Sequence, residues 1–226
     1  MTIWARLSET AQDIGGGVAQ LLSRASKKST APEKSMAFTI GMIALGAKMA
    51  KADGVVTDDE VRAFAQVFHV PAKDRAAVER VFNLAKQDVA GFETYASQVA
   101  KLFAKKSHVL ESVLDGLFHI AKADGAVHED ELTYLERVAE LFGFSRQDFS
   151  RIRSRHVAQR EDPYEALGLE RGISLVDAKK KYKSLVRELH PDKQIAAGVP
   201  AEMVQLATER MSKINAAFAK LERELV

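Results

Sequence analysis

The sequence contains no cysteine among its 226 residues. Disulfide bonds and thiolate zinc sites are therefore excluded, which suits a reducing compartment. An excess of charge of one sign is also lacking, because 33 lysine and arginine residues nearly balance 31 aspartate and glutamate residues, for a net charge of +2. A chain so close to neutrality has no overall electrostatic bias towards nucleic acid or an anionic membrane.

Long hydrophobic runs are absent as well. The longest covers residues 36–47, is interrupted by Thr39, and is flanked by Lys34 and Lys48. A helix of that length is about 18 Å long, whereas the hydrocarbon core of a bilayer is about 30 Å thick. The run therefore predicts a buried core helix. The first residues also lack the cationic and apolar regions of a signal peptide.

The N-terminal segment, residues 1–35, leaves alternatives open. Residues 1–23 carry apolar side chains at helical spacing, interrupted by three consecutive glycines. With Trp4, this segment could lie on a membrane surface, although its acidic residues dilute the basic face that such a helix prefers. The competing interpretations are a short helix packed on the following domain, or disorder. Residues 24–35 are rich in lysine, serine and threonine and indicate a linker.

Residues 36–156 show helical periodicity and no convincing strand, which predicts an all-α domain. A ten-residue segment occurs twice in it: residues 51–60 read KADGVVTDDE, and residues 122–131 read KADGAVHEDE. Each copy predicts a helix, a tight turn at Asp-Gly and a second helix. Two such hairpins indicate a pseudo-symmetric bundle with an internal repeat. Further helices are expected at about 72–88, 92–105 and 145–156.

The repeated segment also suggests a divalent metal site. Each copy places a glutamate seven residues after an aspartate. If the hairpins met across a pseudo-twofold axis, these carboxylates would repel one another unless a cation such as Ca²⁺ or Mg²⁺ joined them. The competing interpretation is turn chemistry followed by a capping box, and the spacing does not fit an EF-hand loop. The candidate ligands are Asp53, Glu60, Asp124 and Glu131.

The C-terminal residues 162–226 predict a second helical unit. A short first helix is closed by Gly168, and a capping-box-like segment at Ser174 starts a long basic helix. That helix has to end at His190, because a residue before proline is pushed out of the α region. After a loop, Pro200 is expected to open a long final helix as its first residue. The expected shape is an antiparallel helical hairpin with a short first helix.

The basic helix and the segment after it describe an electrostatic surface. Lys180, Lys183 and Arg187 fall on one face, opposite the apolar residues. We expect the following loop to be stiffened by Pro191 and to display the Asp192 carboxylate. Such a surface suits a partner with an acidic groove and a nearby arginine. Nucleic acid is not expected, because no aromatic stacking platform accompanies the basic residues. Alone, the basic face would indicate only a solvated helix.

Residues 162–224 resemble the J domain of DnaJ-type co-chaperones along their whole length. The tripeptide His190-Pro191-Asp192 would be a weak motif alone, but here it follows a basic amphipathic helix and precedes another helix. The matching residues are Tyr164, Leu167, Gly168, Tyr182, His190, Pro191, Asp192, Lys193, Ile214, Asn215 and Phe218.

The resemblance implies that the partner is a DnaK/Hsp70 chaperone and that contact raises its ATP hydrolysis. The chain itself would then make or break no bond, so it is not expected to be an enzyme. The expected Hsp70-binding residues are Lys180, Tyr182, Lys183, Arg187, His190, Pro191, Asp192 and Lys193.

The whole chain resembles the DjlA-type co-chaperones of bacteria, which pair a TerB-like (tellurite-resistance B) helical domain with a C-terminal J domain. The implied boundaries are 36–156 and 162–226. That type is typically anchored by an N-terminal membrane helix, a span that this sequence does not show. We therefore expect a cytoplasmic protein, with peripheral contact to the inner membrane through residues 1–23 as the alternative.

The resemblance leaves two functions open. In the first, the J domain recruits and activates DnaK, and the helical domain selects the client protein, partner or location. In the second, the helical domain is a metal- or stress-linked acidic binding module and the J domain is a secondary tether.

Overall fold

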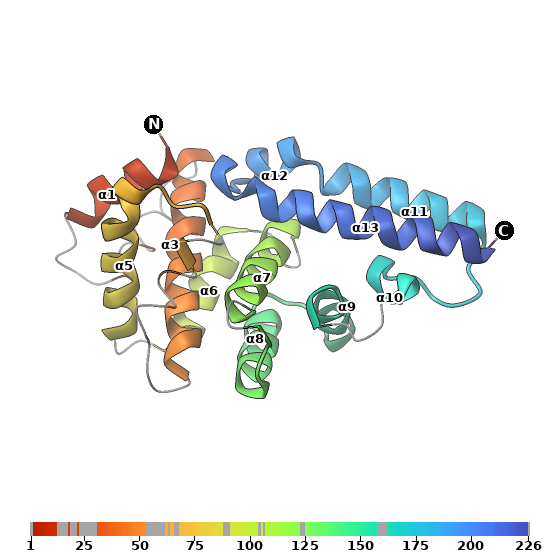
Figure 1. The fold of residues 1–226 in the computed structure, drawn as a ribbon, viewed down its shortest axis with the longest axis horizontal. Helices are drawn as coiled ribbons and strands as arrows, with labels where there is room; N and C mark the ends of the chain where they lie inside the picture. The colour runs from red at the N-terminus through yellow and green to blue at the C-terminus, as the bar shows by residue number, and fades with distance from the viewer. Residues whose placement is uncertain are drawn as a thin grey trace.

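The computed structural model describes residues 2–12, 18, 22, 31–52, 62, 64–65, 68–87, 91–103, 105, 107–122, 125–157 and 162–225. In this part of the chain every regular element is a helix, which confirms the all-α prediction. The elements form two units, a bundle followed by an elongated hairpin (Figure 1).

The bundle is built around one central helix. This helix, α3, packs against α1, α5, α6, α7 and α8, and the apolar run predicted to be a core helix is buried within it. Figure 1 shows α3 upright between α5 and α7. The helices of the bundle are α1 (Ile3–Gln12), α3 (Ala31–Ala52), α5 (Arg75–Gln87), α6 (Phe92–Leu102), α7 (His108–Ala121), α8 (Glu129–Leu141) and α9 (Arg146–Val157).

The start of α3 corrects the predicted linker. The helix begins at Ala31, so residues 31–35 belong to it and not to the connection before it. The polar composition that indicated a linker continues into the first turn of this helix, which also contains Pro32. Proline is compatible with the first turn of a helix, where its missing N–H would have no partner.

The first helix is part of the bundle. Ile3, Trp4 and Leu7 of α1 are 5%, 1% and 0% exposed and belong to the same core as α3. This packing favours the short-helix interpretation of the N-terminal segment over a membrane-surface helix. Among the described residues, none of the helices is long and apolar enough to cross a membrane.

The second copy of the repeated segment forms the predicted hairpin. Helix α7 ends at Ala121, Gly125 has a φ of 113°, and α8 begins at Glu129. The positive φ explains the glycine, because other residues rarely adopt it. Residues 53–60 of the first copy lie outside the described part of the chain. The three further helices expected from the sequence correspond to α5, α6 and α9.

The C-terminal hairpin consists of two long helices. Helices α11 and α13 lie side by side, with the short α10 beneath them (Figure 1). Their facing side chains form a second core of Leu167, Ala178, Leu185, Leu189, Ile214, Phe218 and Leu221. The elements are α10 (Pro163–Leu167), α11 (Leu175–Glu188), α12 (Pro191–Ala197), a 3-10 turn (Ala201–Met203) and α13 (Val204–Leu225).

Two predictions for the hairpin were wrong in detail. The segment after His190 is the helix α12 instead of a loop, because proline is favourable at a first helical position and Gly198 (φ 110°) ends the helix. Pro200 does not open the final helix. It precedes the 3-10 turn, and α13 starts at Val204.

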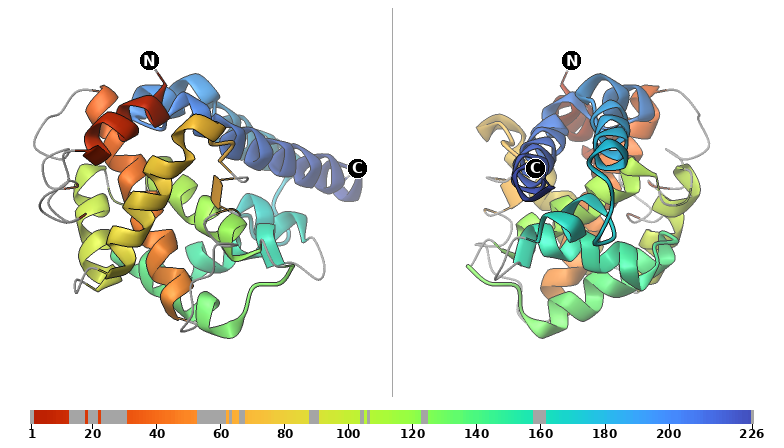
Figure 2. Two further views of the ribbon diagram at one scale, coloured as in Figure 1. Left: turned by 60° about the vertical axis from the view of Figure 1, so that its left-hand side comes forward. Right: turned by 90° about the vertical axis from the view of Figure 1, so that its right-hand side faces the viewer.

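The two units share a core. Val199, Met203 and Leu206, at the start of the final helical segment, are at most 6% exposed and belong to the core of the bundle. The hairpin is therefore docked on the bundle over apolar surface, and its other end extends away (Figures 1 and 2).

Candidate functional site

The tripeptide begins a helix. His190 is the N-cap of α12, and its Nδ1 accepts a hydrogen bond from the Asp192 backbone N–H at 3.3 Å. The His190 carbonyl oxygen accepts from Lys193 N at 2.9 Å and Gln194 N at 3.1 Å. The His190 side chain is 55% exposed and that of Asp192 is 87% exposed. The backbone is thus ordered while both polar side chains face solvent.

The predicted basic face is exposed as well. Lys180, Lys183, Arg187 and Lys193 are all exposed, and a shallow hollow of about 440 Å³ is lined by Lys183 and Arg187 with two uncharged neighbours. Helix α11 ends just before the tripeptide, so the basic residues lead directly to it. The structure therefore places the predicted charged residues along α11 and at the start of α12.

Tyr182 anchors α11, which carries this basic face, to α13. Its ring stacks on Phe218 with centroids 4.1 Å apart, and its hydroxyl donates to Asn215 Oδ1 at 3.0 Å. The side chain is half-buried. The stacking contact and the hydrogen bond are both made to residues of α13, so Tyr182 joins the two long helices of the hairpin.

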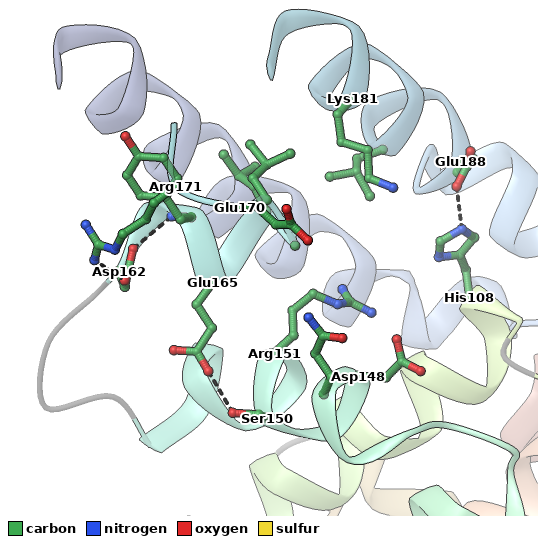
Figure 3. Close-up of a pocket in the computed structure, with 16 residues that line it drawn as sticks. His108, Asp148, Ser150, Arg151, Asp162, Glu165, Glu170, Arg171, Lys181 and Glu188 are labelled. Carbon is green, nitrogen blue, oxygen red and sulfur yellow. Dashed lines mark hydrogen bonds and ion pairs between the residues drawn. The ribbon is translucent and has the colours of Figure 1, made fainter. Parts of the chain in front are cut away.

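Helix α7 of the bundle contacts the residues beside the tripeptide. His108 Nε2 lies 2.7 Å from Glu188 Oε2 (Figure 3). Ser112 Oγ lies 3.3 Å from Gln194 Oε1, and Gln194 Nε2 donates to the Glu188 carbonyl oxygen at 3.4 Å. The Gln194 side chain is buried. The bundle therefore reaches both flanks of the tripeptide.

A cavity of about 540 Å³ separates the two units beyond the His108–Glu188 contact. Figure 3 shows that charged side chains of both signs line it. Ser150 donates to Glu165 Oε1 at 2.8 Å, so α9 is tied to α10 at the far wall. Acidic and basic groups are both present here, and the lining does not single out a ligand of either charge.

Buried charges join the bundle to the hairpin. Glu111 and Asp115 lie one turn apart on α7 and are 2% and 3% exposed. Arg155 of α9 donates to both carboxylates, at 2.8 and 3.2 Å. Arg210 of α13 also donates to both, at 2.8 and 3.3 Å. Arg151 of α9 also pairs with Glu111, at 3.0 Å. Two carboxylates and three guanidinium groups therefore form a compact interdomain ionic network.

The arginines keep the acids ionised. Burial alone would raise the pKa of Glu111, but the charges of Arg210 and Arg155 outweigh it and hold the pKa well below its usual range. Burial would likewise raise the pKa of Asp115, and the Arg155 charge and the hydrogen bond with His156 lower it. Both buried carboxylates are thus compensated by arginine charges within the protein.

His156 completes the network in its neutral form. Its Nε2 lies 2.7 Å from Asp115 Oδ1, and its ring stacks on Phe118 with centroids 4.7 Å apart. Burial lowers the pKa of His156 to about 4, although the bond to Asp115 acts in the opposite direction. At neutral pH the ring therefore donates to Asp115 without carrying a charge.

Of the four candidate metal ligands, only Glu131 lies among the described residues. Asp53, Glu60 and Asp124 lie outside them. Glu131 Oε2 accepts a hydrogen bond from the His128 backbone N–H at 2.9 Å and forms a capping box at the start of α8. No group of three or more potential metal-binding side chains occurs in the part of the chain that the structure describes. The capping interpretation is the one that fits Glu131.

Two protein families match this chain in succession. Residues 39–154 match the family described as Tellurite resistance protein TerB, and residues 162–224 match the DnaJ domain. This chain belongs to the TerB family and carries a J domain after its TerB domain. We call the bundle the TerB domain and the hairpin the J domain from here on.

The curated relatives align with most of this chain, across both domains. "Co-chaperone protein DjlA" of Photobacterium profundum is 26% identical, with 88% of this chain and 82% of the relative covered. The protein of the same name from Coxiella burnetii is 28% identical, with 77% and 73% covered, and the one from Vibrio cholerae is 26% identical, with 78% and 74% covered. No solved structure matches the chain significantly. The resemblance to DjlA-type co-chaperones is confirmed, and J-domain co-chaperones are generally not enzymes.

Sequence reasoning missed the interdomain network. Glu111, Asp115, Arg155 and Arg210 were not candidates because charged residues are usually solvated. One signal was available: Glu111 and Asp115 lie at i and i+4 on a largely apolar helix, so they share one face. The partners in α9 and α13 could not be inferred without the fold.

Proposed function

We propose that this protein binds a DnaK-type Hsp70 and stimulates its ATP hydrolysis through the surface formed by the tripeptide and the basic face of α11. The observation that carries the proposal is the exposure of His190 and Asp192 at the start of an ordered helix within a J domain. A carboxylate held in place can accept charge-assisted hydrogen bonds from an arginine of the partner.

The basic residues serve recognition. Lys180, Lys183, Arg187 and Lys193 are exposed, so they can meet an acidic surface without first breaking buried contacts. Exposed charges of this kind mainly accelerate and orient encounter. The tripeptide then provides the contact that stimulates hydrolysis. The TerB domain selects the client protein, the partner or the location.

The proposal is tested by binding of the full chain to ATP-bound DnaK of the same organism. We expect Asp192→Asn to weaken binding by about tenfold, which corresponds to roughly 1.4 kcal/mol for a charge-assisted hydrogen bond. The matched control is Asp130→Asn, an exposed aspartate in the first turn of α8. Equal binding by wild type and Asp192→Asn would reject the assignment of this surface.

A further inference from the structure

Two residues of the TerB domain hold the tripeptide from both sides. His108 and Ser112 lie one turn apart on α7, so they share a face. His108 contacts Glu188, which lies two residues before His190, at 2.7 Å. The Ser112 hydroxyl donates to the His108 carbonyl oxygen at 2.9 Å and also lies 3.3 Å from the Oε1 of Gln194, two residues after Asp192.

Gln194 links the two contacts. Its side chain is 2% exposed, and its Nε2 donates to the Glu188 carbonyl oxygen at 3.4 Å. A buried amide is costly without hydrogen-bond partners, so its position is strongly determined. Through Gln194, the end of α11 and the start of α12 have a fixed relation to each other and to α7.

The buried network sets the orientation of the His108 ring. Arg210 Nη2 lies 3.1 Å from His108 Nδ1. An arginine can only donate, so Nδ1 is the acceptor and Nε2 carries the proton that faces Glu188. The interdomain charges and the contact beside the tripeptide are therefore parts of one chain of hydrogen bonds.

The side of the tripeptide that would meet a partner stays free. His190 and Asp192 are exposed, and so are Lys183 and Arg187. Helix α7 thus supports the tripeptide from behind without covering it. Groups that are ordered before binding do not lose that freedom on binding, which strengthens recognition.

We propose that His108 and Ser112 of the TerB domain are positioning residues for the tripeptide of the J domain. They hold α12 in the conformation that the Hsp70 partner meets, so the TerB domain tunes the activity of the J domain as well as any selection of clients. This inference rests on the proposed function, because the conformation matters only if the tripeptide engages an Hsp70.

The test compares the full-length wild type with the double variant His108→Ala, Ser112→Ala. We expect the concentration for half-maximal stimulation of DnaK ATP hydrolysis to rise by about three- to tenfold. The loss of the His108–Glu188 hydrogen bond corresponds to roughly two- to tenfold in affinity, and the longer Ser112–Gln194 contact adds to it. Backbone amide exchange over residues 190–197 should also accelerate. The single variant His108→Gln keeps a donor towards Glu188. It should therefore show the wild-type half-maximal concentration and the wild-type exchange rates.

His119→Ala is the matched control. His119 also lies on α7 and pairs with Glu209 of α13 at 3.0 Å, but this interdomain contact is not beside the tripeptide. We expect it to leave both readouts unchanged. If the double variant loses its fold, His108→Ala alone serves, because that side chain is 31% exposed and tolerates truncation.

The outcomes separate the two claims. A double variant that matches a stimulating wild type in both readouts overturns the positioning role alone. An equal loss in His119→Ala also overturns it, in favour of a general docking effect. A wild type that does not stimulate DnaK overturns the proposed function and this inference with it.

Discussion

Arg210 of the J domain donates a hydrogen bond to Glu111 of the TerB domain across 2.8 Å, and neither side chain is more than 3% exposed. The bond joins residues that belong to two different sequence families. With the apolar contacts of Met203 and Leu206 in the TerB core, it makes the two domains one folded unit. The tripeptide is consequently presented at a fixed orientation.

Breaking this pair should destabilise the whole chain. We expect Arg210→Met to lower the free energy of unfolding by about 3 kcal/mol, because the buried carboxylates of Glu111 and Asp115 each lose a charged hydrogen-bond donor. Trp4 is a suitable probe for urea denaturation, since it is the sole tryptophan and is 1% exposed in the TerB core.

The matched control for Arg210→Met is Arg137→Met. Arg137 pairs with Glu140 at 2.8 Å but is 53% exposed. Exposed pairs contribute at most about 1 kcal/mol. If both variants lost stability equally, the interdomain network would not be the stabilising feature described here.

Stability should fall as the pH falls below 6.5. Burial lowers the pKa of His156 from 6.5 to about 4, so between these values the unfolded chain binds a proton that the folded chain does not. The free energy of unfolding therefore decreases as the pH falls, by at most about 3 kcal/mol. His119, whose pKa burial also lowers, acts with the same sign.

The measurement is the free energy of unfolding between pH 7 and pH 4, in wild type and in His156→Gln. Glutamine can still donate to Asp115 but does not titrate, so the slope should become shallower in the variant. Glu111 and Asp115 add a further loss only at lower pH, because their folded pKa values are depressed and their unfolded values lie near 4. An unchanged slope in His156→Gln would contradict this account.

Gly198 marks a close approach between the domains. Its φ is 110°, and a Cβ placed there would lie 2.9 Å from Lys34 Cβ of α3. We expect Gly198→Ala to cost about 2–4 kcal/mol from strain and overpacking together. Gly172→Ala is the control, because its φ is 87° and no atom lies within 4 Å of the added carbon.

For Gly172→Ala only the strain remains, about 1 kcal/mol. Thermal denaturation of the two variants therefore separates the backbone effect from the contact. Melting temperatures that fall by the same amount would mean that the domains do not approach closely at this point.

The exposed basic residues should govern the salt dependence of DnaK binding. We expect the variant Lys183→Ala, Arg187→Ala to bind more weakly than wild type at low salt and to show a shallower loss of affinity as salt rises, because fewer charges are screened. Lys73→Ala, an exposed lysine of the TerB domain, serves as control. Parallel salt dependences for all three proteins would exclude an electrostatic role for α11.

Much of the fold could be predicted because its signals are local. The apolar run in α3, the Gly168 and Gly125 turns and the Ser174 cap each depend on a few neighbouring residues, and each occurs as expected. Helix α12 was missed although Pro191 and Gly198 bracket it with ordinary start and stop signals. Pro191 was interpreted only as the end of the preceding helix and not also as the first residue of a new one.

The exposure of the tripeptide and of the basic face was also predictable, whereas the contacts that α7 makes beside the tripeptide were not. The tripeptide and the basic face follow from sequence order along one helix and the next residues. The contact between His108 and Glu188 joins residues 80 positions apart. Such contacts depend on how two domains dock, which periodicity and spacing do not encode.

The most direct test of the co-chaperone function is single-turnover ATP hydrolysis by DnaK of the same organism, without this protein, with wild type and with His190→Gln. His190 is 55% exposed and caps only a short helix, so the variant should keep its fold and its melting temperature. We expect strong stimulation by wild type and none by His190→Gln. Equal stimulation by both proteins, or none by the wild type, would contradict the proposed co-chaperone function.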